Sequence, residues 1–483
     1  MSITDQAQAE FSALDAANRE LSRSYPGERS ARQPVHTVYG GAHLYRAETT
    51  QRLGELALAS FDQYARDPIE FATSVGFVPR SSLQGWSSAE LATEIARDGE
   101  GLRQRDFGAW LAATIYARVR SKLAREAVED FRIDFEDGFG ARSDAEEDAA
   151  ATRAGLELAR ALKRHLLPPF IGIRIKSFGE ECRLRSARTL EIFLAALLGE
   201  SGGQLPSQFV VTLPKVTLAE QPRALVRSFE LLESHHRLEP GALRLELMIE
   251  STLALLGPDG SSPLPKLLSA CEGRCRGAHF GTYDFTASAG ITAACQHMRH
   301  PLCDLAKGLM LLAYAGTGIF LSDGATTVIP VGPHRAKALT PEQFEENRRV
   351  VHGAWQQSYR DIRHSLENGY HQGWDLHPAQ IPVRYAACYA FFLEGLAPAA
   401  ERLKNFIERA AHATLAGDVF DDAATGQGLL NYFLRAQNSG AITAVEAAAT
   451  GLSQDELSLR SFAQILEARR MRMSSLAPRR SMD

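Results

Sequence analysis

The stretch Phe131-Arg-Ile-Asp-Phe-Glu-Asp-Gly-Phe-Gly140 joins a short run of β-forming residues to a cluster of carboxylates. Asp134, Glu136 and Asp137 lie within four positions and are followed by glycines, which are typical of turns. Three acidic side chains this close together repel one another unless a cation or a basic group offsets their charge. An isolated acidic triplet is usually a solvated turn, so its interpretation depends on the rest of the chain.

Later β-forming runs also end in charged residues. Arg174, Lys215, Glu250 and Asp284 follow the runs 170–173, 209–214, 243–249 and 278–283. A parallel α/β barrel builds its site from residues at the ends of several successive strands. We therefore expect the acidic triplet to be one part of a larger site.

Strand and helix patterns alternate along most of the chain. Strands are expected near 36, 131, 170, 208, 243, 277, 318 and 374, with helical periodicity between them. Eight such strands predict a closed (β/α)8 TIM barrel over residues 35–383, because right-handed crossovers place successive parallel strands side by side. We expect an N-terminal helix and linker over 1–34, a helical insertion at about 60–125 and a helical C-terminal extension over 384–483.

Composition narrows the class of protein. The chain has 483 residues and a net charge of −5, which argues against nucleic acid as a main partner. The first residues lack the pattern of a signal peptide, and the longest apolar stretch, 305–321, carries Lys307 and several glycines. Six cysteines fit a reducing compartment. We expect a cytoplasmic protein with no membrane partner.

Glu250 and Asp284 are the candidate metal ligands. They end two consecutive predicted strands, so a barrel would bring their carboxylates together at one rim. One carboxylate at a strand end is more often a helix cap or a solvated charge. Two oxygen ligands with room for water are how proteins hold Mg²⁺, and Mn²⁺ is the alternative.

These residues carry a resemblance to a known superfamily. The chain resembles citrate lyase β-subunits, malyl-CoA lyases and 2-oxo-acid aldolases of the HpcH/HpaI type, a group that shades into malate synthase. The motifs that carry it, in chain order, are Asp134-Phe-Glu-Asp137, Arg174 in Ile173-Arg-Ile-Lys176, Pro214-Lys215, Met248-Ile-Glu-Ser251, Gly281-Thr-Tyr-Asp284, Ser322-Asp-Gly324 and Leu376-His-Pro-Ala-Gln380.

The resemblance implies a barrel of the phosphoenolpyruvate/pyruvate-binding type and a metal-dependent carbon–carbon lyase or aldolase acting on a 2-oxo or 2-hydroxy acid. It assigns the metal to Glu250 and Asp284. Arg174, Lys215 and Tyr283 would bind substrate, and the catalytic set is Arg174, Asp134, Glu136, Asp137, Asp421 and Asp422.

The proton-transferring base stays open among Asp134, a metal-bound water, and Asp421 or Asp422 in the tail. The resemblance favours the tail, whose acid would reach the site of a neighbouring subunit in a homo-oligomer, a trimer or hexamer. Lys215 could form a Schiff base, but it is more simply an ion-pair partner of the acidic cluster.

Two other functions remain candidates. A Claisen condensation of an acyl-CoA thioester with glyoxylate needs a basic groove for the CoA phosphates, and the predicted barrel loops show no compact Lys/Arg cluster. Lys176 stands where many acyl-CoA enzymes place Asn, and the sequence around Tyr283 leans toward malate synthase. A catalytically silent barrel that binds a metabolite is the third candidate.

Overall fold

The computed structural model of the chain describes residues 7–27, 32–336, 338–416 and 423–476. These residues form two compact units. The barrel unit comprises Met1–Ala59, Leu123–Pro330 and His364–Ile381, and the helical unit comprises Ser60–Lys122, Val331–Arg363 and Pro382–Asp483. Within the described residues, no helix combines the length and the apolar character needed to cross a bilayer.

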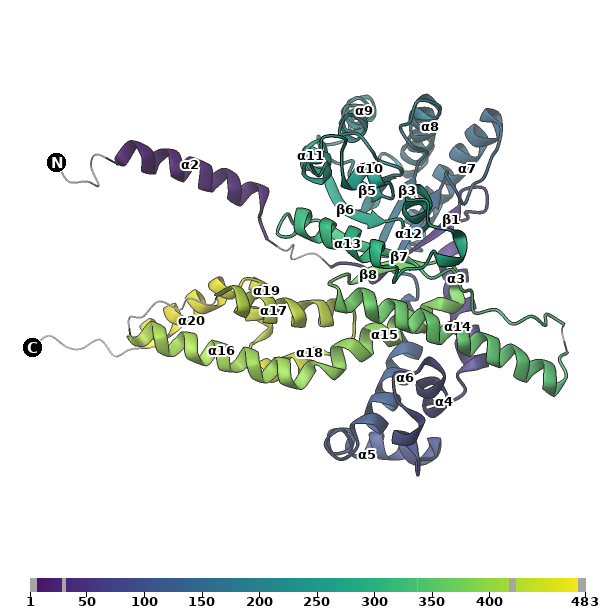
Figure 1. Cartoon of the computed structure of the whole chain (residues 1–483), viewed down its shortest axis with the longest axis vertical. Coiled ribbons are helices and arrows are strands. Elements are labelled where there is room, and N and C mark those ends of the chain that lie inside the picture. Colours follow the sequence, from purple (N-terminus) through teal and green to yellow (C-terminus); the bar gives the residue numbers. More distant parts are fainter. Residues whose placement is uncertain (1–6, 28–31, 337, 417–422, 477–483) are drawn as a thin grey trace, which may run out of the picture. The chain divides into compact units, whose positions relative to one another are not determined.

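The barrel unit contains a closed sheet in which β1 to β8 follow one another in chain order. Every neighbouring pair is parallel, and β8 closes the sheet against β1. The predicted eight-stranded α/β barrel is thus confirmed (Figure 1). The strands are β1 (His36–Gly41), β2 (Asp130–Asp134), β3 (Phe170–Arg174), β4 (Phe209–Leu213), β5 (Leu245–Ile249), β6 (Cys275–Phe280), β7 (Phe320–Ala325) and β8 (Gln372–Asp375).

Helices follow the strands in the same alternating order. Helix α7 begins after Ser143, whose hydroxyl and the Glu146 carboxylate form a capping box, as its sequence predicts. Figure 1 shows α7, α8 and α9 on the outside of the barrel. The helices of this unit are α2 (Gln8–Ser24), α7 (Asp144–Lys163), α8 (Arg183–Ser201), α9 (Glu220–His236), α10 (Thr252–Leu255), α11 (Leu264–Ser269), α12 (Thr282–Ser288), η2 (Ala293–Cys295), α13 (Pro301–Tyr314) and η3 (Pro378–Gln380).

The helical unit has its own aromatic core. The centroid of the Phe71 ring lies 4.9 Å from that of Phe61 and 5.9 Å from that of Trp355. Its helices are α4 (Pro68–Val75), η1 (Arg80–Leu83), α5 (Ser88–Arg105), α16 (Leu396–Ala416), α17 (Ala423–Asn438), α18 (Ala444–Ala447), η4 (Ala448–Thr450), α19 (Gln454–Leu459) and α20 (Phe462–Leu476). Helices α3 (Thr49–Tyr64), α6 (Phe107–Glu126), α14 (Pro341–Glu367) and α15 (Ile381–Glu394) have residues in both units.

The barrel interior contains charged residues. Along β2, Asp130, Arg132 and Asp134 occupy alternate positions and therefore face the same side of the sheet. Arg132 forms ion pairs with Asp130 on its own strand and with Glu246 on β5, at 2.7 Å to the latter. Barrel interiors are usually filled by branched aliphatic side chains, so an ionic layer here supports the site above it at an energetic cost.

Candidate active site

Arg174 and Asp134 form the centre of the site. They end the neighbouring strands β3 and β2 at paired positions. Arg174 Nε and Nη2 donate to the two carboxylate oxygens of Asp134 at 2.7 and 2.5 Å. Asp134 also accepts the backbone N–H groups of Glu136 and Gly138, at 3.0 and 2.7 Å. Both Asp134 oxygens are therefore engaged by the protein itself.

Glu136 and Asp137 face the two basic residues of the rim. Arg174 Nη1 lies 3.1 Å from a Glu136 oxygen and 3.4 Å from an Asp137 oxygen. Lys215 Nζ pairs with Glu136 and lies 3.3 Å from Asp137 Oδ1. Burial raises the pKa of Glu136, and the negative charge of Asp137 acts in the same direction although Arg174 opposes both. The sequence interpretation of Lys215 as an ion-pair partner of the acidic cluster agrees with this geometry.

Glu250 is a buried carboxyl group next to other acids. It follows β5 and is 3% exposed. Lys215, held in the left-handed backbone region at φ 52°, donates its backbone N–H to Glu250 Oε1 at 2.6 Å. Burial raises the pKa of Glu250 to about 8, and the negative charges of Asp284 and Glu136 add to the effect. Among the described residues, no Lys or Arg side chain forms an ion pair with it.

Asp284 lies close enough to Glu250 for its charge to act on that carboxyl group. The sequence predicted Asp284 at the end of a strand, but β6 ends at Phe280 and Asp284 lies in the first turn of α12. Gly281 joins β6 to α12. Only glycine fits here without displacing Glu250, because a Cβ would lie 2.5 Å from Glu250 Cβ and 2.6 Å from its Oε2. Tyr283, from the same turn, donates its hydroxyl to the Ala325 carbonyl at 2.9 Å.

The donor set suits a hard divalent cation. Glu250 and Asp284 offer carboxylate oxygens, and Glu250 forms no ion pair with a Lys or Arg side chain among the described residues, although the charge of Arg174 partly offsets the nearby acids. Within the described part of the chain, no three His, Cys, Asp or Glu side chains converge as a ready-made metal cluster. Mg²⁺ is commonly held by one or two carboxylates with water and substrate oxygens completing its shell, so two ligands are sufficient for this fit.

Two motifs from the sequence analysis lie beside the site in structural roles. Asp323, in Ser322-Asp-Gly324, is fully buried and binds Lys307 Nζ at 3.0 Å and Ser365 Oγ at 2.6 Å. Gln380 accepts the backbone N–H of Leu376 at 2.8 Å and donates to the Thr326 carbonyl at 2.9 Å, so it links the segments after β7 and β8. Asp421 and Asp422 lie outside the described residues.

An aromatic layer that the sequence analysis missed lies under Arg174. The Tyr39 ring lies 4.8 Å from the Arg174 guanidinium carbon and 4.8 Å from the Trp374 ring. Trp374 Nε1 donates to His279 Nδ1 at 3.0 Å, and the other nitrogen of His279 lies 3.0 Å from Glu246 Oε2. Since an indole N–H only donates, His279 carries its hydrogen on Nε2 and donates it to Glu246.

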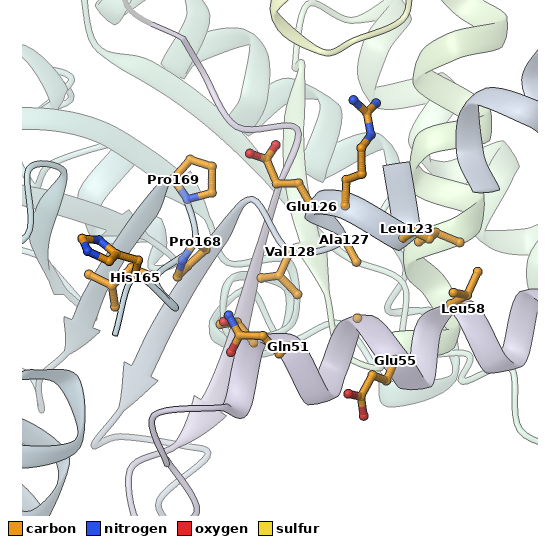
Figure 2. Close-up of a pocket in the computed structure, with 15 residues that line it drawn as sticks. Gln51, Glu55, Leu58, Leu123, Glu126, Ala127, Val128, His165, Pro168 and Pro169 are labelled. Carbon is orange, nitrogen blue, oxygen red and sulfur yellow. The ribbon is translucent and has the colours of Figure 1, made fainter. Parts of the chain in front are cut away.

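A cavity of about 560 Å³ in the barrel unit lies away from these residues. Figure 2 shows it lined by Gln51 and Glu55 of α3, by Leu123–Val128, and by Pro168 and Pro169 just before β3. These segments precede β2 and β3, so the cavity lies at the amino ends of the strands. Barrel sites are built at the opposite, carboxyl ends, and the cavity is therefore not part of the acidic site.

The sequence matches one family model over residues 14–465, and the chain belongs to that family, described as Domain of unknown function (DUF6986). No curated protein matches the sequence. The family assignment covers both units and names no reaction.

Solved structures that are similar to this chain include the following three. A citrate lyase from Burkholderia xenovorans LB400 is 19% identical, covers 70% of this chain and 93% of its own, and has a TM-score of 0.46. Haloferax volcanii malate synthase with magnesium and glyoxylate is 15% identical, with 91% and 97% covered and a TM-score of 0.44. An HpcH/HpaI aldolase from Desulfitobacterium hafniense DCB-2 is 15% identical, with 57% and 85% covered and a TM-score of 0.30. Likenesses at this level do not say what this chain binds or catalyses.

Proposed function

We propose that this protein is a divalent-metal-dependent carbon–carbon lyase or aldolase that cleaves or forms a bond in a 2-oxo or 2-hydroxy acid through an enolate. The observation that carries the proposal is the buried Glu250 carboxyl, which faces Asp284 and Glu136 without a side-chain cation of its own. A buried carboxylate in such a field is costly, and a bound cation removes the cost.

Glu250 and Asp284 would hold the ion, Mg²⁺ or Mn²⁺. When bound, such an ion stabilises the negative charge that develops on a carbonyl oxygen as the bond to the neighbouring carbon breaks or forms. The acids around the ligands keep the site negative and favour a divalent cation over an anion.

Arg174 would orient the substrate oxygens. Asp134 holds two of its nitrogens, so the guanidinium has one fixed orientation and presents Nη1 to the rim. A planar, permanently charged fork suits a carboxylate or an enolate oxygen. Preorganisation of this kind is usually the largest contribution to catalysis of such reactions.

Proton transfer is assigned to an acid of the tail. Asp134 is a poor base in this arrangement, because its two oxygens already accept two guanidinium and two backbone hydrogen bonds. Asp421 or Asp422 of a neighbouring subunit would take the role, which makes the active form a homo-oligomer. Glu136 and Asp137 hold Arg174 and Lys215 in place.

A screen for release of pyruvate or oxaloacetate tests the proposed function. The full chain is incubated with a panel of 4-hydroxy-2-oxo acids and acyl-CoA thioesters, with Mg²⁺, with Mn²⁺ and with EDTA. Metal-dependent release from at least one hydroxy-oxo acid is the expected result. Turnover of acyl-CoA with glyoxylate alone would favour the Claisen condensation, and turnover that EDTA leaves unchanged would contradict the metal site.

A further inference from the structure

A cluster of basic side chains surrounds Phe139, two residues after the acidic triplet. The His43 ring lies 5.7 Å from the Phe139 ring, the Arg142 guanidinium carbon 4.9 Å and the Lys176 ammonium 5.3 Å. His43 follows β1, Arg142 follows β2 and Lys176 follows β3. The cluster therefore lies at the same rim of the barrel as the acidic site, because all three segments leave the carboxyl ends of strands.

The backbone near His43 makes room for its ring. A Cβ at Gly41 would lie 2.7 Å from His43 Cε1 and would overlap the Gly138 carbonyl oxygen, so only glycine lets the imidazole lie against this turn. His43 Nδ1 is buried and finds no hydrogen-bond partner among the described residues. A buried polar atom without a hydrogen-bond partner is energetically unfavourable. The Nδ1 atom of His43 is therefore a polar group that no described protein atom satisfies.

Arg153 of α7 belongs to the same cluster. Glu157, one turn further along α7, accepts the backbone N–H of Ala47 at 3.0 Å, so this face of the helix faces the segment after β1. Arg153 lies on that face, one turn nearer the rim, and its Nε is buried without a partner in the described chain. Burial lowers the pKa of His43, and the positive charges of Arg142 and Arg153 lower it further, as their proximity requires.

The two arginines of the cluster form no ion pair among the described residues, although the charge of Arg142 acts on the nearby Glu146 carboxylate. Arg142 donates to the Phe139 carbonyl at 3.0 Å, and no carboxylate in the described residues forms an ion pair with Arg142 or Arg153. Lys176 differs, since it pairs with Glu147 at 3.0 Å. The nearby Glu146 carboxylate is held by the backbone N–H and hydroxyl of Ser143, at 2.9 and 2.7 Å. By contrast, the acids of the site neutralise both Arg174 and Lys215.

We propose that His43, Arg142 and Arg153 bind an oxyanion of the phosphate class carried by the substrate whose other end occupies the acidic site. The inference rests on the proposed function, because it extends the same substrate. An anionic group would be repelled by the acids around Glu250 and attracted by two unpaired guanidinium groups, whose forked N–H groups match phosphate oxygens. The segment 136–140 runs from the acidic residues Glu136 and Asp137 to Phe139 of the basic cluster, so the two regions are joined by a short stretch of chain at one rim.

This cluster corrects one expectation from the sequence. The sequence analysis found no compact Lys/Arg cluster in the predicted barrel loops, because Arg142 and Arg153 are separated by ten residues of other types and His43 comes from the segment after β1.

Binding of inorganic phosphate to the full-length protein tests the site, by calorimetry at low salt. Arg142→Gln/Arg153→Gln removes both free guanidinium groups. Arg223→Gln/Arg227→Gln, on the exposed face of α9, removes the same charge elsewhere on the barrel unit. We expect saturable binding to the wild type, a loss of affinity of about tenfold or more in the first variant, and wild-type affinity in the second. An equal loss in both variants, or no saturable binding to the wild type, would overturn the site.

Two further experiments are needed. One tests this inference separately from the proposed function, and the other identifies the kind of compound that carries the phosphate group. Glu250→Gln should lose turnover but keep phosphate binding, so failure of either proposal is visible on its own. Glycerol 3-phosphate and coenzyme A are then used as competitors of inorganic phosphate. Displacement by either compound supports a substrate-borne group and says which kind, whereas displacement by neither would overturn that part. Arg142 is exposed, so Arg142→Gln alone decides the matter if the double variant is unfolded.

Discussion

Asp134 and Arg174 occupy paired positions at the ends of β2 and β3, and their side chains meet in a two-point contact at 2.7 and 2.5 Å. The register of the sheet and the planar shapes of the two groups fix this contact together. A guanidinium held this way keeps its third nitrogen at the rim beside Glu136 and Asp137. The register of β2 and β3 thus fixes the orientation of the Arg174 guanidinium through Asp134.

Replacing Arg174 by Lys should therefore lower kcat/KM by about 100-fold although the charge is kept. A lysine ammonium offers no planar fork for Asp134 and a substrate oxygen at once. Steady-state kinetics on a substrate from the release screen provide the measurement. Arg227→Lys on exposed α9 serves as the control. Normal turnover of the Arg174→Lys protein would make Arg174 a structural residue.

Glu250→Gln and Asp284→Asn should each remove metal-dependent turnover and weaken Mn²⁺ binding by at least about 100-fold. Glu250→Gln should melt no earlier than the wild type in EDTA, because it replaces a buried carboxyl group whose pKa burial and neighbouring acids raise to about 8. Titration with Mn²⁺ followed by electron paramagnetic resonance, beside thermal melts, gives both quantities. Wild-type Mn²⁺ affinity in both variants would place the metal elsewhere.

The order of strands and helices was predictable because each element has a local pattern. Helix α14 (Pro341–Glu367), for example, has proline at its first position, where this residue is favoured. The end of β6 could not be predicted. The strand stops before Gly281, but Tyr283 and Phe285 continue a β-like sequence pattern into the first turn of α12. Aromatic residues fit both structures, so only tertiary packing decides between them.

The site was predictable where its residues end strands, and not where they lie inside the barrel. Arg174 and Glu250 could be found from the sequence alone, since each follows a β-forming run. Arg132 and Glu246 are charged residues within strands, and their pairing depends on the register of strands that are far apart in the sequence. The alternation of Asp130, Arg132 and Asp134 along β2 was the one available sign of a charged interior.

Glu246→Gln should lower the free energy of unfolding by about 3–5 kcal/mol, because it leaves the buried Arg132 with one fewer partner. Burial alone would raise the pKa of Glu246, but the positive charge of Arg132 and the interactions with His279 together outweigh burial, and the pKa lies below its usual value. A carboxyl group with a lowered folded-state pKa contributes its full stabilisation above its unfolded-state pKa, and this contribution is lost progressively as the pH falls from that value through the folded-state pKa. Urea melts at pH 7 and in acid well below the ordinary pKa of a glutamate should therefore show the difference between variant and wild type shrinking. A constant difference would contradict the assignment.

Mixing two inactive proteins tests whether sites are shared between subunits. We expect Arg174→Ala combined with Asp421→Ala/Asp422→Ala to recover part of the activity after subunit exchange, because some hybrid oligomers would contain one complete site. Native mass spectrometry confirms the exchange and gives the oligomeric state, expected to be a trimer or hexamer. Exchange without recovery would mean that the tail acids act within their own chain or not at all.

Gly281→Ala tests the metal site without changing a ligand. A Cβ at this position would lie 2.5 Å from Glu250 Cβ and 2.6 Å from Glu250 Oε2, so the Glu250 side chain must shift from its position. The backbone of Gly281, at φ −93°, is open to any residue, which makes the crowding the only effect of the change. We expect Mg²⁺ affinity and turnover to fall by about 10–100-fold. Gly308→Ala on α13 adds the same methyl group where nothing lies within 4 Å and should leave both unchanged. If Gly281→Ala bound Mg²⁺ and turned over like Gly308→Ala, the position of the Glu250 carboxylate would not matter for the reaction, and the metal would have to be bound by other residues.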